Sequence, residues 1–170
     1  SVVPDSFYDE ADRLGIMIWQ EFYRPYTGPD PAGRRQNLTE ASRLIHRLRC
    51  HPGLVLWCGG NESLMFYNWA HNGQEMPGTC VFTHDLRDLC QSLDPSRPYL
   101  PESPYGGCDH NDPRQWDTHC YTNYSFVPGY DYANFISEDF RISAPPLRSC
   151  LRFMDPEDIW PLGYQQVMLP

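Results

Sequence analysis

The chain has 170 residues, which is enough for one ordinary domain with its own hydrophobic core. Its formal net charge of −9, with only short arginine groups at 34–35 and 43–49, argues against a nucleic-acid partner. The apolar run LVLWC at 54–58 is far too short to span a bilayer, so we expect no membrane partner.

The chain opens with a predicted helix and a predicted strand. Residues 4–15 (PDSFYDEADRLG) place acidic side chains in the first turns and apolar ones at helical spacing, with Gly15 where a helix would end. Its predicted inward side chains are Phe7, Ala11 and Leu14. IMIWQEF, residues 16–22, is a short run of the buried type that ends in Gln20 and Glu21, and it predicts a strand.

A loop and a second helix come next. Residues 23–35 are rich in Pro and Gly and predict a loop. Asn37 and Glu40 resemble a capping box, so we expect the helix to begin near Asn37 and to end at His51-Pro52-Gly53. Its predicted inward side chains are Leu38, Ala41, Leu44, Ile45 and Leu48.

The middle of the chain continues the alternation. LVLWC at 54–58 is wholly apolar, which suits a strand in a parallel sheet that is covered on both faces. A third helix, terminated at Asp94-Pro95, is indicated by the spacing of Phe82, Leu86, Leu89 and Leu93. RPYLP, residues 97–101, predicts a short strand.

The last third of the chain predicts two further strands and a helix. DTHCYT at 117–122 and ANFISED at 133–139 are the strands, SAPPLRSCLRFM at 143–154 is the helix, and DPEDIW at 155–160 is one further turn. Alternating helices and strands are typical of an α/β fold built on a parallel sheet.

Every predicted strand ends in polar residues. These are Gln20-Glu21, Asn61-Glu62, Glu102-Ser103, His119 with Tyr121, and Ser137-Glu138. Because the C-terminal ends of parallel strands share one edge, where ligands bind, we expect these side chains to gather there.

Two of these carboxylates suit glycoside hydrolysis. A retaining glycosidase holds two carboxyl groups about 5–5.5 Å apart, one as the nucleophile and the other as general acid and then base. Glu62 and Glu138 each end a predicted strand, and closure of a barrel would bring them face to face. We expect Asn61 to donate to the sugar 2-hydroxyl, and Gly59 and Gly60 to let the backbone come near without side-chain obstruction.

The same edge carries further candidate binding residues. His119 and Tyr121 lie two apart on one strand and so share a face, from which they could bind sugar hydroxyls or orient Glu138. Trp19, Trp57, Trp69 and Trp116 are candidate stacking platforms for a pyranose ring, although core packing is the commoner use of a tryptophan.

Plainer interpretations compete with these. Glu62 could cap the start of the next helix, and Glu138 could pair with Arg141. The seven cysteines include no C-x-x-C pair and their number is odd, which favours free thiols over a disulfide framework.

A zinc site is a third hypothesis. Its ligands would be Cys108, His110, His119 and Cys120. Their spacing matches no standard zinc pattern, and a neighbouring His-Cys pair on a strand points to opposite faces of the sheet, so a metal is disfavoured.

Five stretches of the sequence, taken together, match one known pattern. They are YDEADRLGIMIWQEF, RLRCHPGLVLWCGGNES, SLDPSRPYLPESPYGG, DTHCYTNYSFVPG and FISEDFRISAPPLRS, and they span nearly the whole chain. In this order they resemble the catalytic barrel of glycoside hydrolase family 2, nearest to its β-mannosidase and exo-β-glucosaminidase branch. The Trp-x-Gly-Gly-Asn-Glu portion is the specific part. The resemblance implies a (β/α)₈ TIM barrel whose acid/base, at the end of the fourth strand, matches Glu62 and whose nucleophile, at the end of the seventh, matches Glu138.

The chain also departs from the family pattern. It has Ser137-Glu138-Asp139-Phe140 where members often have Ser-Glu-Phe-Gly or Ser-Glu-Tyr-Gly, and Glu21 where β-mannosidase-like sequences commonly have Asp. A complete barrel takes about 250 residues. We therefore expect residues 1–170 to be a partial catalytic barrel, with about strands three to seven, and the flanking strands and domains of a larger parent chain to be absent.

These observations predict an enzyme, a retaining exo-β-glycosidase that acts on a carbohydrate with a terminal β-mannoside or β-glucosaminide and needs no cofactor. Besides the two carboxylates, the predicted substrate-binding residues are Asn61, Trp57, Glu21, His119, Tyr121 and Trp19. The alternative is a non-catalytic carbohydrate-binding remnant of such a barrel, which keeps the aromatic and polar edge without a competent catalytic pair.

Overall fold

The computed structural model describes residues 2–22, 30–106, 109–120, 133–139 and 146–159. The chain falls into two compact units, Ser1–Asp139 and Phe140–Pro170. The described part of the second unit contains two one-turn helices, α5 (Leu147–Cys150) and α6 (Pro156–Ile159). The helix predicted at 143–154 is therefore confirmed only as a shorter one, and the further turn after it is confirmed.

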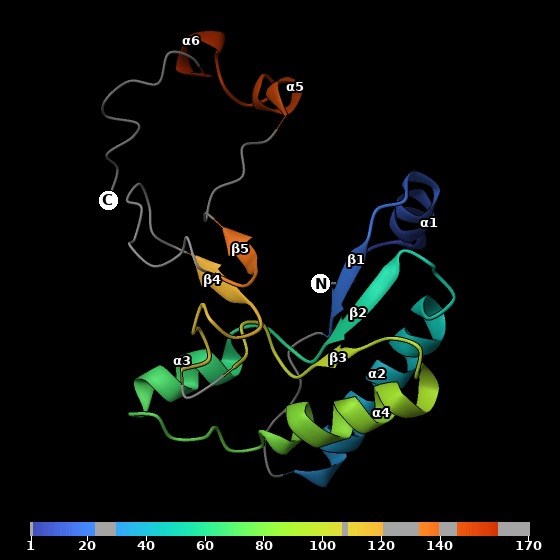
Figure 1. The fold of residues 1–170 in the computed structure, drawn as a ribbon. Coiled ribbons are helices and arrows are strands. Elements are labelled where there is room, and N and C mark those ends of the chain that lie inside the picture. The colour runs from blue at the N-terminus through green and yellow to red at the C-terminus, as the bar shows by residue number, and fades with distance from the viewer. Residues whose placement is uncertain (1, 23–29, 107–108, 121–132, 140–145, 160–170) are drawn as a thin grey trace. The chain divides into compact units, whose positions relative to one another are not determined.

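Within the described residues, the strands lie in the first unit and pair in parallel. One sheet has the order β1 (Ile18–Glu21), β2 (Leu54–Cys58) and β3 (Tyr99–Leu100), and a second pairs β4 (Thr118–Cys120) with β5 (Ile136–Asp139) (Figure 1). An isolated parallel bridge between Asn61 and Ser103 lies beyond the ends of β2 and β3. Parallel strands that alternate with helices confirm the predicted α/β class.

The buried face of α1 (Asp5–Leu14) differs from the predicted one. Tyr8 is 0% exposed, whereas Phe7 is 52% and Leu14 is 54% exposed. The Tyr8 hydroxyl donates to Gln20 Oε1 at 2.5 Å, so this ring brings its own polar partner into the core. The inward positions expected for Phe7 and Leu14 are therefore wrong. The spacing of apolar residues along a helix does not show that a tyrosine will have a buried hydrogen-bond acceptor in the core.

Helix α2 (Pro31–Leu48) begins earlier than predicted, so the loop expected over 23–35 is wrong for its last five residues. The Asp30 carboxylate accepts from the N–H groups of Ala32 at 3.0 Å and of Gly33 at 3.1 Å. Pro31 occupies the first helical position, where its missing N–H has no intrahelical partner to lose. Asp30 and Pro31 thus start the helix ahead of Asn37.

Helix α3 (Ser63–Ala70) has no counterpart among the predicted elements. The third predicted helix is confirmed, and it consists of a π-helical turn, η1 (Val81–Asp85), that leads into α4 (Leu86–Leu93). Helices α2 and α4 lie side by side along the β1–β3 sheet (Figure 1).

The hydrophobic core lies between this sheet and its helices. Its largest members are each at most 1% exposed, and they are Trp57, Tyr8, Phe82, Ile45, Leu48, Leu54 and Leu86. Within the described ranges, the helices are all too short or too polar to cross a membrane.

Two glycines follow β2 where neighbouring groups leave no room for a side chain. A Cβ at Gly59 would collide with the Pro101 carbonyl oxygen and the Tyr99 hydroxyl, and a Cβ at Gly60 would lie 2.7 Å from the Phe82 ring. The close approach expected at these glycines is thus made by the protein's own third strand and core.

We expect Gly59→Ala to lower the free energy of unfolding by about 2–4 kcal/mol, because the Pro101 carbonyl belongs to the backbone and cannot rotate away. Gly73→Ala is the control. A Cβ at Gly73 meets nothing within 4 Å, and its φ of 82° alone should cost about 1–2 kcal/mol. Denaturant unfolding of both variants compares them, and equal losses would contradict the collision.

Candidate active site

Glu62 follows β2 in an uncommon backbone conformation. Its φ of 60° lies in the left-handed region, which is unfavourable for a residue with a side chain. Two hydrogen bonds hold it there: its N–H donates to the Ser103 carbonyl oxygen at 2.9 Å, and its own carbonyl accepts from Phe66 N–H at 2.9 Å. The Glu62 side chain makes no capping bond to α3 and turns toward His119, so the capping interpretation of this side chain is wrong.

The N-terminus of α3 is capped instead by Glu102, whose side chain is fully buried. Glu102 Oε1 accepts from Ser63 N–H at 2.7 Å, and Oε2 accepts from Leu64 N–H at 2.7 Å and Met65 N–H at 3.4 Å. Burial raises the pKa of Glu102 to about 7, and the three backbone donors oppose that rise. Glu102 therefore fixes the backbone that immediately follows Glu62.

Glu138 reaches the site from β5, which carries a β-bulge. The register of β4 and β5 shifts just before the pair His119 and Glu138, so Ser137 is an extra residue without a partner in the ladder. Ser137 and Glu138 are sequence neighbours that would normally point to opposite faces of a strand. The bulge allows both of them to make contacts in the same polar cluster.

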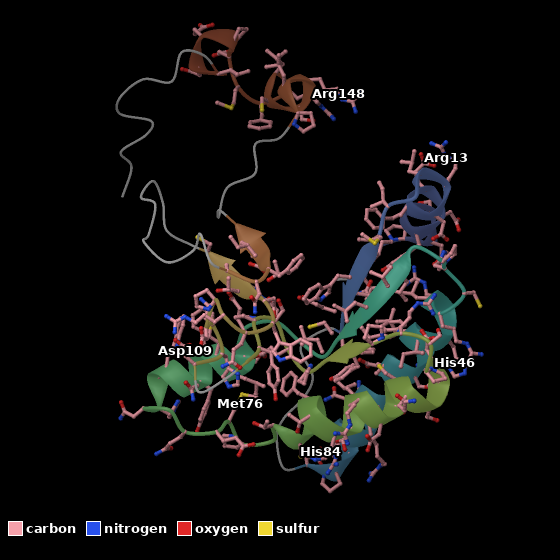
Figure 2. All side chains as sticks on the ribbon, in the orientation of Figure 1. Arg13, His46, Met76, His84, Asp109 and Arg148 are labelled. Atoms are coloured by element: carbon pink, nitrogen blue, oxygen red, sulfur yellow. The ribbon has the colours of Figure 1, made fainter. Side chains whose placement is uncertain are left out.

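The imidazole of His119 lies between the two carboxylates and is 0% exposed. Its Nδ1 is 2.9 Å from Glu62 Oε1 and 3.7 Å from Glu138 Oε2, and one ligand atom of each of the three side chains lies within 4.8 Å of the other two. The carboxyl groups that the sequence puts at two strand ends thus belong to one site. By contrast, His46 and His84 are exposed on helices (Figure 2).

A second row of polar side chains is buried behind His119. Its Nε2 is 2.9 Å from Ser103 Oγ, and Ser103 Oγ donates to Asp117 Oδ2 at 2.6 Å. Ser137 Oγ donates to the same oxygen at 2.7 Å, and Tyr105 N–H donates to Asp117 Oδ1 at 3.3 Å. The His119 ring is therefore held at both of its nitrogens.

Asn111 holds the backbone of β4 beside the site. Its Oδ1 accepts from His119 N–H at 2.8 Å and from Thr118 Oγ1 at 2.6 Å, while its Nδ2 donates to the His119 carbonyl at 3.0 Å. An amide side chain thus makes the bonds that a paired strand would make here, and it fixes the position of the histidine along β4.

Asn61 and Glu21 both interact with the Glu138 carboxylate, Asn61 through a hydrogen bond and Glu21 through its charge. In the amide orientation that satisfies its neighbours, Asn61 Nδ2 donates to the Ser103 carbonyl and to Glu138 Oε1, each at 3.2 Å. Burial, and then the negative charge of Glu138, raise the pKa of Glu21 at the end of β1. The pKa of Glu21 therefore depends on the charge of Glu138 in β5.

Of the four candidate tryptophans, Trp57 lies in the core, Trp19 is half-buried, and Trp69 and Trp116 are exposed. Trp57 is 0% exposed, stacks on Phe22 with ring centroids 5.4 Å apart, and donates from Nε1 to Asp94 Oδ2 at 2.9 Å. Its expected role as a sugar platform is corrected to core packing. Trp19, on the same strand as Glu21 and two residues away, is half-buried and stacks on the exposed Phe135 with centroids 6.2 Å apart.

Several predicted participants lie outside the described residues: Tyr121, Arg141 and Cys108. Within the described residues, the arrangement suited to holding a metal is the Glu–His–Glu cluster around His119, and it includes neither His110 nor Cys120. The zinc set is thus not assembled there. Among the described cysteines, Cys50, Cys58, Cys80 and Cys90 are free thiols, as predicted.

The sequence reasoning assigned no role to four residues that organise the site: Glu102, Ser103, Asn111 and Asp117. Glu102 and Ser103 carried a signal, since they are polar residues at a strand end. Asp117 carried another, because it lies two residues before His119 on one predicted strand and so shares its face. Asn111 lies in a loop and had none.

Comparison with known proteins gives consistent relatives. Residues 6–137 match the family model described as glycosyl hydrolases family 2, TIM barrel domain. The chain is 34% identical over 134 residues to β-mannosidase B of Thermothelomyces thermophilus, covering 67% of this chain and 15% of that protein. It is 32% identical over 113 residues to β-mannosidase of Rattus norvegicus, covering 61% and 13%.

A solved structure also matches. The crystal structure of β-D-mannosidase from Dictyoglomus thermophilum superposes with a TM-score of 0.75 at 34% sequence identity, covering 92% of this chain and 20% of that one. This likeness extends to the parallel strands and confirms a partial TIM barrel. The chain spans only 13–20% of the length of these three β-mannosidases.

We expect the contribution of Glu102 to stability to fall as pH rises. Its folded pKa of about 7 lies above the ordinary value of 4.5, so the unfolded chain loses this proton first. The contribution is fully present below pH 4.5 and is lost as pH passes about 7, by about 1–3 kcal/mol in total.

Denaturant unfolding of the wild type and of Glu102→Gln at pH 5 and pH 8 measures this change. The wild-type advantage over the variant should shrink at pH 8, while exposed Glu75→Gln should show no such trend. An advantage that grows with pH would mean that the three backbone donors outweigh burial.

Proposed function

This chain belongs to glycoside hydrolase family 2, and on that premise we propose that it is the catalytic part of a retaining exo-β-glycosidase that cleaves terminal β-mannosides. The names of its relatives support the mannoside, and the carboxylate geometry supports the retaining mechanism. A β-glucosaminide is the second substrate class that this proposal has to be tested against.

The observation that carries the proposal is the spacing of the two carboxyl groups. An oxygen of Glu62 and one of Glu138 lie within 4.8 Å of each other, with His119 Nδ1 as close to both. Retaining enzymes hold their carboxyls about 5–5.5 Å apart, whereas inverting enzymes leave room for a water at about 6.5–9.5 Å. The spacing here is nearer to the retaining range than to the inverting one.

In the proposed first step, Glu62 gives its proton to the glycosidic oxygen while a Glu138 oxygen bonds to the anomeric carbon and the bond to the leaving group breaks. In the second step, Glu62 removes a proton from water, the water oxygen bonds to the anomeric carbon, and the bond to Glu138 breaks. The roles follow the match of Glu62 and Glu138 to the acid/base and nucleophile positions of the family, and the Glu62 side chain is 17% exposed against 43% for Glu138.

Neighbouring residues have proposed binding roles. Asn61 Nδ2 is 3.2 Å from Glu138 Oε1, so a sugar whose anomeric carbon meets that carboxylate would bring its 2-hydroxyl near the same amide. Glu21 and Trp19 are two apart on β1, and we assign them to hydroxyl binding and to an aromatic wall.

The partner in this proposal is a carbohydrate, and the chain supplies about strands three to seven of a barrel whose other strands lie in further sequence. The five described parallel strands and the limited share of each relative that the chain spans support this division.

Covalent trapping tests the nucleophile. We expect incubation with an activated 2-deoxy-2-fluoro-β-mannoside to add one sugar to the peptide that contains Glu138, because the fluorine slows release of the glycosyl intermediate. Peptide mass spectrometry locates the adduct. Glu138→Gln should abolish labelling, whereas Asp139→Asn at the neighbouring acid should retain it.

Labelling that survives Glu138→Gln would remove Glu138 from the nucleophile role. Saturable binding of a β-mannoside without any adduct or hydrolysis would support the carbohydrate-binding remnant instead.

Substitution of the proposed acid/base gives a separate test. Glu62→Gln should lower kcat for a β-mannoside with an unactivated sugar leaving group by about 10²–10⁴-fold, because the leaving oxygen then departs without a proton. Steady-state kinetics on a panel of β-mannosides and β-glucosaminides measures this and the preferred sugar. Turnover within twofold of wild type would refute the role of Glu62.

A further inference from the structure

The buried side chains behind the site form a row of hydrogen bonds, and the donor and the acceptor of each bond depend on which atoms carry hydrogens. The row runs from Asp117 through Ser103 to His119 and on to Glu62, with successive distances of 2.6, 2.9 and 2.9 Å. Ser103 and Asp117 are at most 2% exposed and His119 is 0% exposed. Buried donors and acceptors of this kind need defined partners, so the positions of their hydrogens are constrained.

The donors and acceptors of this row can be assigned starting from Asp117. A carboxylate only accepts hydrogen bonds, and three groups point at this one: the hydroxyls of Ser103 and Ser137 at Oδ2, and the N–H of Tyr105 at Oδ1. Each hydroxyl has a single hydrogen, and both are directed to Asp117. Ser103 Oγ can therefore only accept from His119 Nε2, which places a hydrogen on that nitrogen.

The consequence appears at the other side of the ring. A neutral imidazole with its hydrogen on Nε2 has a lone pair on Nδ1, and this atom lies 2.9 Å from Glu62 Oε1. A hydrogen bond at that distance needs one proton between the two atoms. The proton rests on Glu62 when the imidazole is neutral, and on Nδ1 when the imidazole is charged.

We propose that Asp117, acting through Ser103, fixes His119 as the Nε2–H tautomer, so that before the first step the His119–Glu62 pair holds the proton that Glu62 delivers to the leaving group. This inference rests on the proposed function, since it assumes that Glu62 is the general acid. Asp117, Ser103 and His119 are positioning residues in it, because they act through Glu62.

The arrangement also accounts for the order of events. The proton leaves Glu62 for the glycosidic oxygen in the first step, and the proton taken from water in the second step returns to the same pair. The second carboxylate, Glu138, has an oxygen 3.7 Å from Nδ1, farther than Glu62, so the histidine proton is directed to the acid/base. With the opposite tautomer, Nδ1–H would donate to an ionised Glu62, which would then lack its proton.

Nuclear magnetic resonance of the ¹⁵N-histidine-labelled protein tests the tautomer without any substrate. We expect His119, identified by the signals lost in His119→Gln, to carry a hydrogen on Nε2 at every pH at which the protein is folded. A neutral His119 with its hydrogen on Nδ1 would overturn the proposal, and this measurement on the wild type needs no other variant to fold.

A pair of serine variants provides the matched control. Ser103 and Ser137 both donate to Asp117 Oδ2, at 2.6 and 2.7 Å, but Ser103 is the one that accepts from His119 Nε2. Ser103→Ala should allow the hydrogen to move to Nδ1, whereas Ser137→Ala should leave it on Nε2. An unchanged tautomer in Ser103→Ala would overturn the proposal that Asp117 acts on His119 through Ser103.

The dependence of kcat/KM on the leaving group shows whether the tautomer fixed by Asp117 and Ser103 matters for catalysis. Ser103→Ala should lower kcat/KM by about tenfold or more for a β-mannoside with an unactivated sugar leaving group, and by less than about twofold for 2,4-dinitrophenyl β-mannoside, whose leaving group needs no proton. Equal losses on both substrates would indicate a merely structural serine and would overturn the catalytic part of the proposal.

These tests separate the inference from the proposed function. Labelling of Glu138 together with an Nδ1–H tautomer of His119 would overturn the inference about the tautomer and leave the proposed function standing. An Nε2–H tautomer in a protein whose Glu138 is never labelled would overturn the proposed function, and the catalytic use of the tautomer with it.

Discussion

The hydrogen bond between His119 Nδ1 and Glu62 Oε1 is the contact on which the rest of the site depends. It joins the end of β2 to β4, and the same nitrogen faces Glu138 at the end of β5. Glu62 follows β2 and Glu138 lies in β5, which belong to different sheets, and the buried imidazole of His119 lies between the two carboxylates. Because the ring is fully buried, the cost of leaving either nitrogen without a partner keeps it in this position.

Glu102 and Ser103, which follow β3, support Glu62 in two ways. Glu102 receives the N–H groups of the residues that follow Glu62, and Ser103 binds Glu62 N–H through its carbonyl and His119 through its hydroxyl. Two adjacent residues thus fix both the backbone around Glu62 and its side-chain partner. This double support explains how Glu62 persists with a φ of 60°.

The sequence was most informative where one physical requirement dominated. LVLWC could be predicted as a parallel strand because every residue is apolar, but its expected burial on both faces is wrong at Val55, which is 38% exposed. Glu62 and Glu138 could be recognised as candidates because the sequence places a charge at the end of each predicted strand. It was misleading where requirements competed: Tyr8 replaced Phe7 and Leu14 in the core because it found an acceptor in Gln20. The β-bulge at Ser137, the cap from Glu102 and the burial of Trp57 depend on contacts between distant segments, which no local pattern records. The family resemblance located the two carboxylates but not the row of residues that orients them.

The central claim is that the two carboxylates act as a nucleophile and an acid/base on one sugar. The most direct measurement is the anomeric configuration of the first product, followed by proton nuclear magnetic resonance during hydrolysis of a β-mannoside, before mutarotation equilibrates the anomers. The spacing within 4.8 Å predicts the β-anomer, with retained configuration. Initial release of the α-anomer would contradict the account, because inversion requires a water in the place that Glu138 is proposed to occupy.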